Sequence, residues 1–539
     1  MSGAPRPPPA ASRSGVVTQT VIMKFLPQKQ IACLLLLSQS ALAAPVSVVR
    51  PEQLDLQLPD TAGQVIEPAQ AGAGNGDKRP DIQLPEIGDP SGTIITPLQE
   101  KALGEAFFRS LHNELNINQD PEISDYIQSI GQKLAANSDN PFQAYHFFVV
   151  TDPDINAFAG PGGYIGVNSG LILTSEQESE LASVLAHEIA HVTQRHLYQT
   201  FQAAGRMTLP MAAAMLAAVL LGAKAGSGQM SQAAIVAAQA ANMQYQINFT
   251  RDNEAEADRV GMQILSRSEF DPRAMPNFFE KMQQSTRFAG HGLPEFLLTH
   301  PVTVSRISDT RGRAEKFTYR QYPDSFAYQI IRAKLRVQTA PSPQQALAYF
   351  RAITGHGTPE QQDVTRYGLA LSLIAAMKFK EGQPILQQLT AKYPEQSQFI
   401  NALAQSEVDS RDYPSALRLY EQALQRFPSN RAIRLNFTKA LMLTGNARKA
   451  KSLLEDMVHE AAVSPEVYNL MGQCYAALGR EAESHRYVAE AYYANGQTRA
   501  AILQLRIARS LAGKDFYVNA VIDERLKQFI AEEEEKRKR

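Results

Sequence analysis

The spacing of apolar residues changes several times along the chain, and each change predicts a different element. Apolar positions first recur at helical intervals over 98–107. Residues 147–150 form an apolar run that is typical of a buried strand, and 164–167 predict a second strand after a Gly/Pro-rich turn at 156–163. A helix follows, and we expect Ser175 to cap it. Strands set between helices predict an α+β domain that is mostly helical with a small β-sheet.

From about residue 325 the pattern becomes one of repeated helices. Two aromatic-proline pairs, Tyr393-Pro394 and Phe427-Pro428, lie 34 residues apart, which is the period of the tetratricopeptide repeat (TPR). A Tyr-x-x-Met-Gly-x-x-Tyr stretch at 468–475 matches the first helix of that repeat. The sequence therefore predicts an all-α TPR solenoid of about four repeats, whose concave face would bind other proteins. A purely structural helical domain is the alternative.

The first part of the chain has the composition of an address and a linker. Lys24 and Lys29 precede a short apolar block at 31–37, and Ala41-Leu42-Ala43 follows as an A-x-A-like cleavage site. This is the pattern of a cleaved secretory signal with Met23 as its start. We therefore expect a periplasmic protein. The predicted division is an upstream extension with signal peptide (1–44), a disordered linker (45–95), the α+β domain (96–320), the TPR solenoid (325–515) and a C-terminal helix or tail (516–539).

Composition excludes several classes of protein. Of 539 residues, 44% are hydrophobic and 20% are charged, as in ordinary soluble chains. The net charge of −1 lacks the basic footprint of a nucleic-acid-binding protein. Removal of the signal would remove Cys33 and leave only Cys474, which excludes a disulfide framework and a cysteine-rich zinc site.

The strongest chemical signal is the sequence His187-Glu188-Ile189-Ala190-His191. Histidines four residues apart lie on one face of a helix, so both imidazoles can bind one ion. Glu188 lies beside them, where a carboxylate can take a proton from the attacking water. The flanking residues are apolar, so the helix is buried, and buried ionisable side chains need partners that a cation supplies. The motif therefore predicts one Zn²⁺ per subunit.

A third ligand is expected on a second helix. Glu254 and Asp258 are four residues apart, so one can bind zinc while the other accepts a hydrogen bond from a ligand histidine. Glu256 points away from Glu254 and is expected in solvent. His196 lies about 140° round the helix from His191, which favours an outer or structural position over a ligand.

These motifs, followed by Thr299-His300-Pro301 and Arg306, recur in the same order in the gluzincin-type peptidases related to HtpX and the CAAX prenyl proteases, which the chain resembles. With the signal and the repeats, it is similar to the soluble branch of periplasmic chaperone-proteases. The resemblance implies a zinc endopeptidase that assists outer-membrane protein assembly and degrades misassembled outer-membrane proteins. Their assembly machinery would bind the TPR domain.

The resemblance also implies a role for each matching residue. His187, His191 and Glu254 would be the zinc ligands, with Glu188 as general base and Asp258 as the supporting catalytic carboxylate. His300 would be a fourth ligand that latches the site or, alternatively, a loop anchor, and Arg306 would support the site. The substrate would lie along an edge strand comprising Gly163, Tyr164, Ile165, Gly166 and Val167.

Two questions stay open at this point. Residues 207–223 are 17 uncharged residues, at the lower limit for crossing a membrane, and predict a lid or core helix, a peripheral membrane contact or a span. The chain as a whole is a protease with chaperone activity or, alternatively, a TPR binding scaffold whose metal site is largely latent.

Overall fold

The computed structural model describes residues 96–198, 251–288, 295–323, 325–459 and 464–537. The predicted signal peptide, the linker before residue 96 and the uncharged segment 207–223 lie outside these ranges. Every helix within the described ranges is too short or too polar to cross a lipid bilayer.

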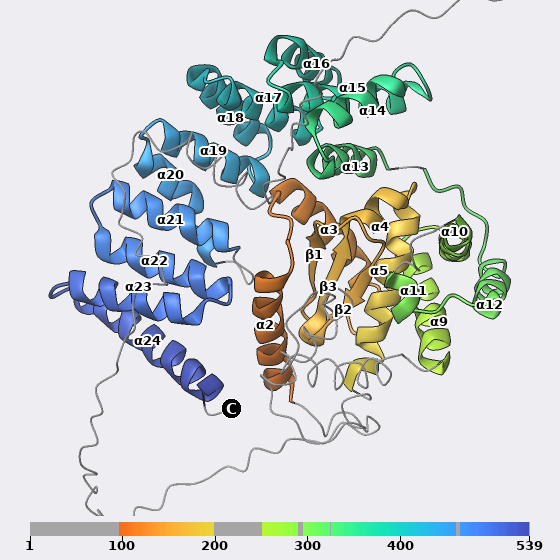
Figure 1. Cartoon of the computed structure of the whole chain (residues 1–539), viewed down its shortest axis with the longest axis horizontal. Helices are drawn as coiled ribbons and strands as arrows, with labels where there is room; N and C mark the ends of the chain where they lie inside the picture. Colours follow the sequence, from red (N-terminus) through yellow and green to blue (C-terminus); the bar gives the residue numbers. More distant parts are fainter. Residues whose placement is uncertain (1–95, 199–250, 289–294, 324, 460–463, 538–539) are drawn as a thin grey trace, which may run out of the picture. The chain divides into compact units, whose positions relative to one another are not determined.

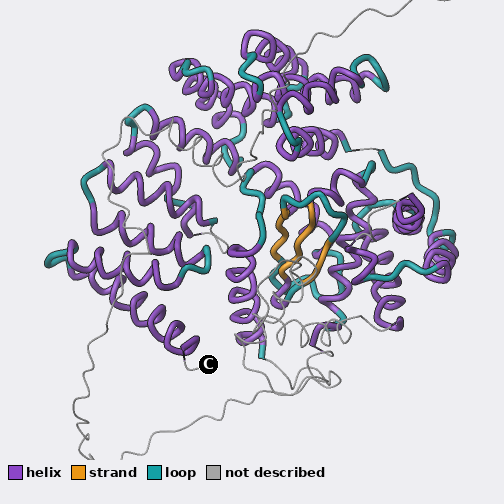
Figure 2. Tube along the Cα trace, in the orientation of Figure 1, coloured by secondary structure: helices purple, strands orange, loops and turns teal. Residues whose placement is uncertain are grey.

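A three-stranded sheet lies among the helices of the region before residue 315 (Figure 2). Its strands are β1 (His146–Val150), β2 (Ala157–Ala159) and β3 (Tyr164–Asn168), in the order β1-β3-β2. Strand β3 pairs in parallel with β1 and antiparallel with β2. Gly166 stands opposite Phe158, and a Cβ at this position would fall 2.5 Å from the Phe158 ring, so the close pairing requires glycine.

The helices of this region are α2 (Pro97–Glu114), α3 (Pro121–Ala135), α4 (Ser169–Thr174), α5 (Glu178–Thr193), α9 (Arg251–Arg267), α10 (Ala274–Phe288), α11 (Glu295–Thr299) and α12 (Val304–Ala314), with a 3₁₀ turn η3 (Pro161–Gly163) before β3. Some of them pack against the sheet, and α9, α10 and α12 lie beyond α5 (Figure 1). Helix α5 packs against β2, β3 and α9. All its residues from Glu180 to His191 are buried, so it forms the centre of the hydrophobic core.

The start of α5 differs from the prediction. Its N-cap is Gln177, and Ser175 instead ends α4, where its hydroxyl donates to the Leu171 carbonyl. Two acids, Glu178 and Glu180, lie in the first turn of α5, where their negative charges interact favourably with the positive end of the helix dipole. The helix predicted there is confirmed, and its cap lies two residues after the expected Ser175.

The second part of the chain is helical. Its elements are α13 (Phe326–Thr339), α14 (Pro343–Ala352), α15 (Pro359–Ala375), α16 (Phe379–Lys392), α17 (Ser397–Asp409), α18 (Tyr413–Arg426), α19 (Arg431–Leu443), α20 (Ala447–Leu454), η5 (Met457–His459), α21 (Pro465–Ala477), α22 (Glu481–Ala494), α23 (Thr498–Leu511) and α24 (Phe516–Arg537). From α15 to α24, helices adjacent in sequence pack against each other. This packing confirms the predicted solenoid.

The repeat is also visible in the backbone. Met377, Arg411, Gly445, Gly479 and Gly513 follow one another at intervals of 34 residues, and all have positive φ, between 55° and 75°. Each follows the end of a helix, where a left-handed residue reverses the chain. The period inferred from two aromatic-proline pairs therefore applies to five turns.

Candidate metal centre

Helix α5 supplies two imidazoles that face each other. The Nε2 atoms of His187 and His191 lie 3.0 Å apart, and both side chains are buried. Glu188, between them in sequence, is 1% exposed. Its Oε1 makes no hydrogen bond among the described residues and lies 3.5 Å from His300 Nε2. The motif therefore forms a buried, closely packed group of ionisable side chains.

Helix α9 adds two carboxylates to this group. Glu254 Oε2 lies 3.5 Å from His187 Nε2, and Glu254 Oε1 lies 3.5 Å from His191 Nε2. One turn later, Asp258 Oδ1 lies 3.1 Å from His187 Nδ1. The two helices meet closely at Gly261, where a Cβ would come within 3.2 Å of the His187 amide nitrogen. A larger residue at 261 would separate the histidines from the acids.

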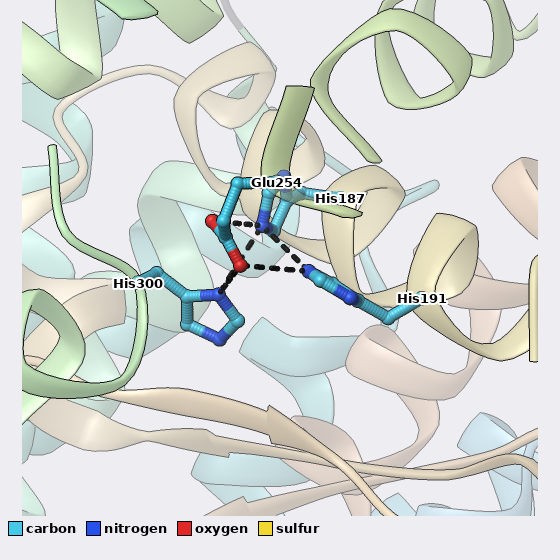
Figure 3. A group of neighbouring side chains, drawn as sticks. All are labelled: His187, His191, Glu254 and His300. Carbon is cyan, nitrogen blue, oxygen red and sulfur yellow. Dashed lines mark hydrogen bonds and ion pairs between the residues drawn. The ribbon is translucent and has the colours of Figure 1, made fainter. Parts of the chain in front are cut away.

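His300, directly after α11, completes the cluster (Figure 3). Its Nδ1 lies 2.9 Å from Glu254 Oε1 and 3.4 Å from His187 Nε2. Its ring packs against Phe296, with 5.0 Å between the centroids. One ligand atom from each of His187, His191, Glu254 and His300 lies within 4.8 Å of the other three. Four donors from three separate segments therefore converge on one point.

Arg306 of α12 holds the carboxylates in place. Its Nε and Nη2 donate to the two oxygens of Asp258 at 2.8 and 2.7 Å. Its Nη1 lies 2.7 Å from Glu254 Oε2 and donates to the Pro301 carbonyl at 3.0 Å. The guanidinium also stacks over the Phe279 ring at 4.8 Å. Arg306 thus connects both acids to the loop that carries His300.

The surroundings shift the pKa values of these groups in opposite directions. Burial disfavours the charged form of Glu254 and Asp258, but the neighbouring positive groups outweigh it, so the pKa of each carboxyl lies below its usual value. Burial raises the pKa of Glu188, although His300 and His187 act in the opposite direction. Burial also takes the pKa of His191 well below its usual value. The site therefore combines ionised acids with one carboxyl that holds a proton more readily.

The structure brings most of the predicted site residues together and separates one group from them. It gathers His187, Glu188, His191, Glu254, Asp258, His300 and Arg306. The predicted substrate edge is wrong: Tyr164, Ile165, Gly166 and Val167 belong to β3, which is paired on both sides, and Gly163 ends η3. A central strand has no free backbone groups to offer a peptide.

The strand beside α5 is β2, which forms one edge of the described sheet. It falls within the segment predicted as a turn, since three residues flanked by glycine and proline give little strand signal. The backbone of Ala159 in β2 hydrogen-bonds to Glu188. This contact was not predicted, and nothing in the sequence indicates it.

Glu256 is substantially exposed to solvent, as predicted, and it also contacts a buried histidine. Its carboxylate lies 3.4 Å from His196 Nε2, and its side chain is 41% exposed. His196 itself is fully buried, and its Nδ1 lies 2.9 Å from His191 Nδ1. His196 thus lies next to a proposed ligand, outside the cluster of four donors.

Comparisons with known proteins agree with this geometry. The chain matches the family model "Peptidase family M48" over residues 121–314 and the model "Tetratricopeptide repeat" over 407–474. It is 32% identical over 421 residues to the beta-barrel assembly-enhancing protease of Yersinia pestis, which covers 78% of this chain and 86% of that protein. The protein of the same name from Escherichia coli K12 is 31% identical over 445 residues, covering 83% of this chain and 91% of the relative.

A more distant relative shares a shorter region. The mitochondrial metalloendopeptidase OMA1 of Schizosaccharomyces pombe is 32% identical over 184 residues, which cover 34% of this chain and 50% of that protein. The family implies a metal cofactor, and the cluster of four donors on α5, α9 and the loop after α11 is the candidate site for it. With its HExxH helix, its acidic second helix and its solenoid, the chain is a metallopeptidase and belongs to peptidase family M48.

Proposed function

We propose that this protein is a periplasmic zinc endopeptidase with chaperone activity, which promotes the assembly of outer-membrane β-barrel proteins and degrades those that misassemble. The observation that carries the proposal is the cluster of four donors beside the buried Glu188. The names of the relatives, which describe beta-barrel assembly-enhancing proteases, support the substrate class.

Zinc fits the donor atoms. A tetrahedral zinc site with bonds of about 2.0–2.1 Å separates its ligand atoms by about 3.3 Å. Among His187 Nε2, His191 Nε2, the Glu254 oxygens and His300 Nδ1, five of the six residue pairs are separated by 2.9 to 3.5 Å, and one ligand atom from each residue lies within 4.8 Å of the other three. Two imidazoles and a carboxylate are also the ligand set of known catalytic zinc sites. We therefore assign His187, His191 and Glu254 as the zinc ligands, one ion per subunit.

The side chains then divide the work of peptide hydrolysis. Zinc, when bound, polarises the scissile carbonyl and activates the attacking water. Glu188 accepts the proton from that water and passes it to the leaving amine, a task that a raised carboxyl pKa favours. Asp258 and Arg306 are positioning residues, because they hold His187 and Glu254 without reaching the reacting atoms.

Strand β2 is the proposed place for the substrate backbone. Successive residues of an edge strand direct their backbone groups alternately toward the paired strand and away from it. An extended peptide adds to such an edge through main-chain hydrogen bonds, which suits unfolded substrates of varied sequence. The contact of the Ala159 backbone with Glu188 supports this proposal.

His300 is proposed as a latch. A catalytic zinc site keeps one position open for water or substrate, whereas a site closed by four protein ligands is structural. His300 Nδ1 occupies the fourth corner of the donor cluster, and it also contacts Glu254. Movement of the loop between α11 and α12 would open that corner. The loop-anchor alternative predicts no gain of activity when His300 is removed.

The TPR solenoid, proposed to span 325–515 after a peptidase domain at 96–320, supplies a binding surface for the outer-membrane assembly machinery. A scaffold with an idle metal site is less well supported, because such a protein has no use for a buried Glu188 beside two histidines.

The test compares wild type with Glu188→Gln on an outer-membrane β-barrel protein, presented both unfolded and folded in detergent. We expect wild type to cleave the unfolded form and spare the folded one. Glu188→Gln should still bind the unfolded form but leave it intact, because the base is gone while the proposed ligands remain. Equal cleavage by both proteins would contradict the assignment of Glu188. Equal cleavage of both substrate forms would contradict the proposed role in quality control.

A further inference from the structure

The buried His196 lies where it can control a proposed zinc ligand. Helix α5 ends at Thr193, and Arg195 then adopts a left-handed conformation with φ of 57°. This turn reverses the chain and places the His196 ring 5.0 Å from the His191 ring, centroid to centroid. A continued helix would have carried His196 about 140° away from His191. The contact therefore depends on the end of the helix rather than on helical spacing.

The two ring nitrogens of His196 contact different partners. Its Nδ1 lies 2.9 Å from His191 Nδ1, on the side away from the donor cluster. Its Nε2 lies 3.4 Å from Glu256 Oε2 on α9. His191 itself presents Nε2 to the cluster, 3.0 Å from His187 Nε2. A chain of polar contacts thus runs outward from the cluster through His191 and His196 to Glu256.

Proton positions along this chain are fixed once His191 binds an ion. An imidazole that binds a cation through Nε2 carries its proton on Nδ1. His191 Nδ1–H must then donate, so His196 Nδ1 must accept. A neutral His196 that accepts at Nδ1 carries its own proton on Nε2, and that N–H points toward the Glu256 carboxylate. The opposite arrangement would leave the proton of His191 on Nε2 and block ion binding.

The other histidine of the motif has a shorter support. His187 Nδ1 lies 3.1 Å from Asp258 directly, with no intervening ring. Ligand histidines in metal sites commonly donate their second N–H to a carboxylate or carbonyl, which sets the tautomer and raises the basicity of the ligand nitrogen. Both histidines of this site therefore have a carboxylate behind them, one in direct contact and one through His196.

We propose that His196, backed by Glu256, is the positioning residue of His191: it holds the Nδ1–H tautomer and the ring orientation that zinc binding requires. The inference rests on the proposed role of His191 as a zinc ligand. We expect His196 to contribute more to zinc affinity than Glu256 does. Glu256 is 41% exposed and also contacts Arg259 at 3.4 Å, so solvent and a second charge weaken the effect of its carboxylate.

The experiment measures the zinc affinity of the full chain by competition with a chromophoric chelator. His196→Leu keeps a side chain of similar bulk but has no hydrogen-bond acceptor. We expect its zinc affinity to fall by about 10- to 100-fold, as for other residues that support metal ligands. His196→Asn offers a side-chain oxygen near the position of Nδ1 and should restore affinity to within a few-fold of wild type. This rescue separates the tautomer role from simple packing.

Glu256→Gln provides a test that does not depend on a core substitution. The residue is partly exposed, so the variant should fold, and we expect a loss of affinity that is smaller than that of His196→Leu. Asp252→Asn is the matched control, since it removes an exposed acid from the first turn of the same helix and should leave affinity unchanged. Thermal unfolding in excess EDTA shows whether each variant is folded.

The outcomes separate this inference from the proposed function. Zinc affinity of the wild type tests the proposed function. Wild-type affinity in His196→Leu, or equal affinity in Glu256→Gln and Asp252→Asn, would overturn the inference while leaving the zinc site intact. Equal losses in His196→Leu and His196→Asn would also overturn it, because packing alone would then explain the effect.

Discussion

Replacing Arg306 by leucine would remove the guanidinium that contacts two buried carboxylates. Arg306 donates to both oxygens of Asp258 at 2.7 and 2.8 Å and lies 2.7 Å from Glu254. Arg306 is 9% exposed, so water cannot replace its guanidinium. Breaking a buried ion pair from one side costs about 3–5 kcal/mol, and we expect a loss of that size in the free energy of unfolding. The free energy of unfolding of Arg306→Lys should lie between those of wild type and Arg306→Leu, because an ammonium cannot bridge both acids in the same geometry.

The assay is urea unfolding followed by circular dichroism, with and without zinc. Zinc should reduce the deficit of Arg306→Leu, because a dication restores positive charge beside Glu254. Arg311→Leu on the same helix is the control, since Arg311 is 51% exposed and pairs only at the surface. Its cost should not exceed about 1 kcal/mol. A deficit of Arg306→Leu no larger than that of Arg311→Leu, in EDTA, would refute the reasoning.

Acid should reduce the same deficit. Burial opposes ionisation of Asp258, but His187 and Arg306 outweigh it, so its pKa in the folded chain lies below the ordinary value of 3.8. A carboxyl with a lowered pKa stabilises the fold above its unfolded pKa, and this contribution is lost as the pH falls through the folded value. The variant lacks the contribution from Arg306 at every pH. The free energies of unfolding of wild type and Arg306→Leu should therefore converge as the pH falls below about 4.

Three further predictions concern the latch and the turns of the solenoid. His300→Ala should keep zinc on three ligands and raise casein cleavage several-fold, including self-cleavage; activity no higher than wild type would identify His300 as an anchor. Arg411→Gly should raise the free energy of unfolding by about 1 kcal/mol, because Arg411 has a φ of 67° that glycine adopts without strain. Gly445→Ala, at the equivalent turn with a φ of 75° and open space for the Cβ, should lower it by about as much; equal stability of all three proteins in thermal unfolding would contradict the role of these turns.

Local patterns in the sequence were sufficient for the helices that carry the metal cluster. His187 and His191 are four residues apart and therefore share one face of an α-helix. The apolar residues on both sides of them indicate burial. The 34-residue period of the solenoid is likewise a local property that repeats. These features are set by short-range spacing, so the structure agrees with them closely.

Features that depend on long-range contact or on chain reversal could not be predicted in the same way. Strand β2 has only three residues, and its place at the edge of the sheet depends on pairing with β3. His196 contacts His191 because Arg195 is left-handed, a conformation that an arginine seldom adopts. The same turn leaves the His196 ring facing Glu256, a contact that helical geometry alone does not predict.

The central claim is that one ion held by His187, His191 and Glu254 works with Glu188 as the base. Metal content and casein cleavage, measured on the same purified samples, test it most directly. Wild type and Glu188→Gln should each hold one zinc per chain, and only wild type should cleave. Glu254→Ala should have lost both the metal and the activity. Full cleavage by Glu188→Gln, or stoichiometric zinc in Glu254→Ala, would contradict the account.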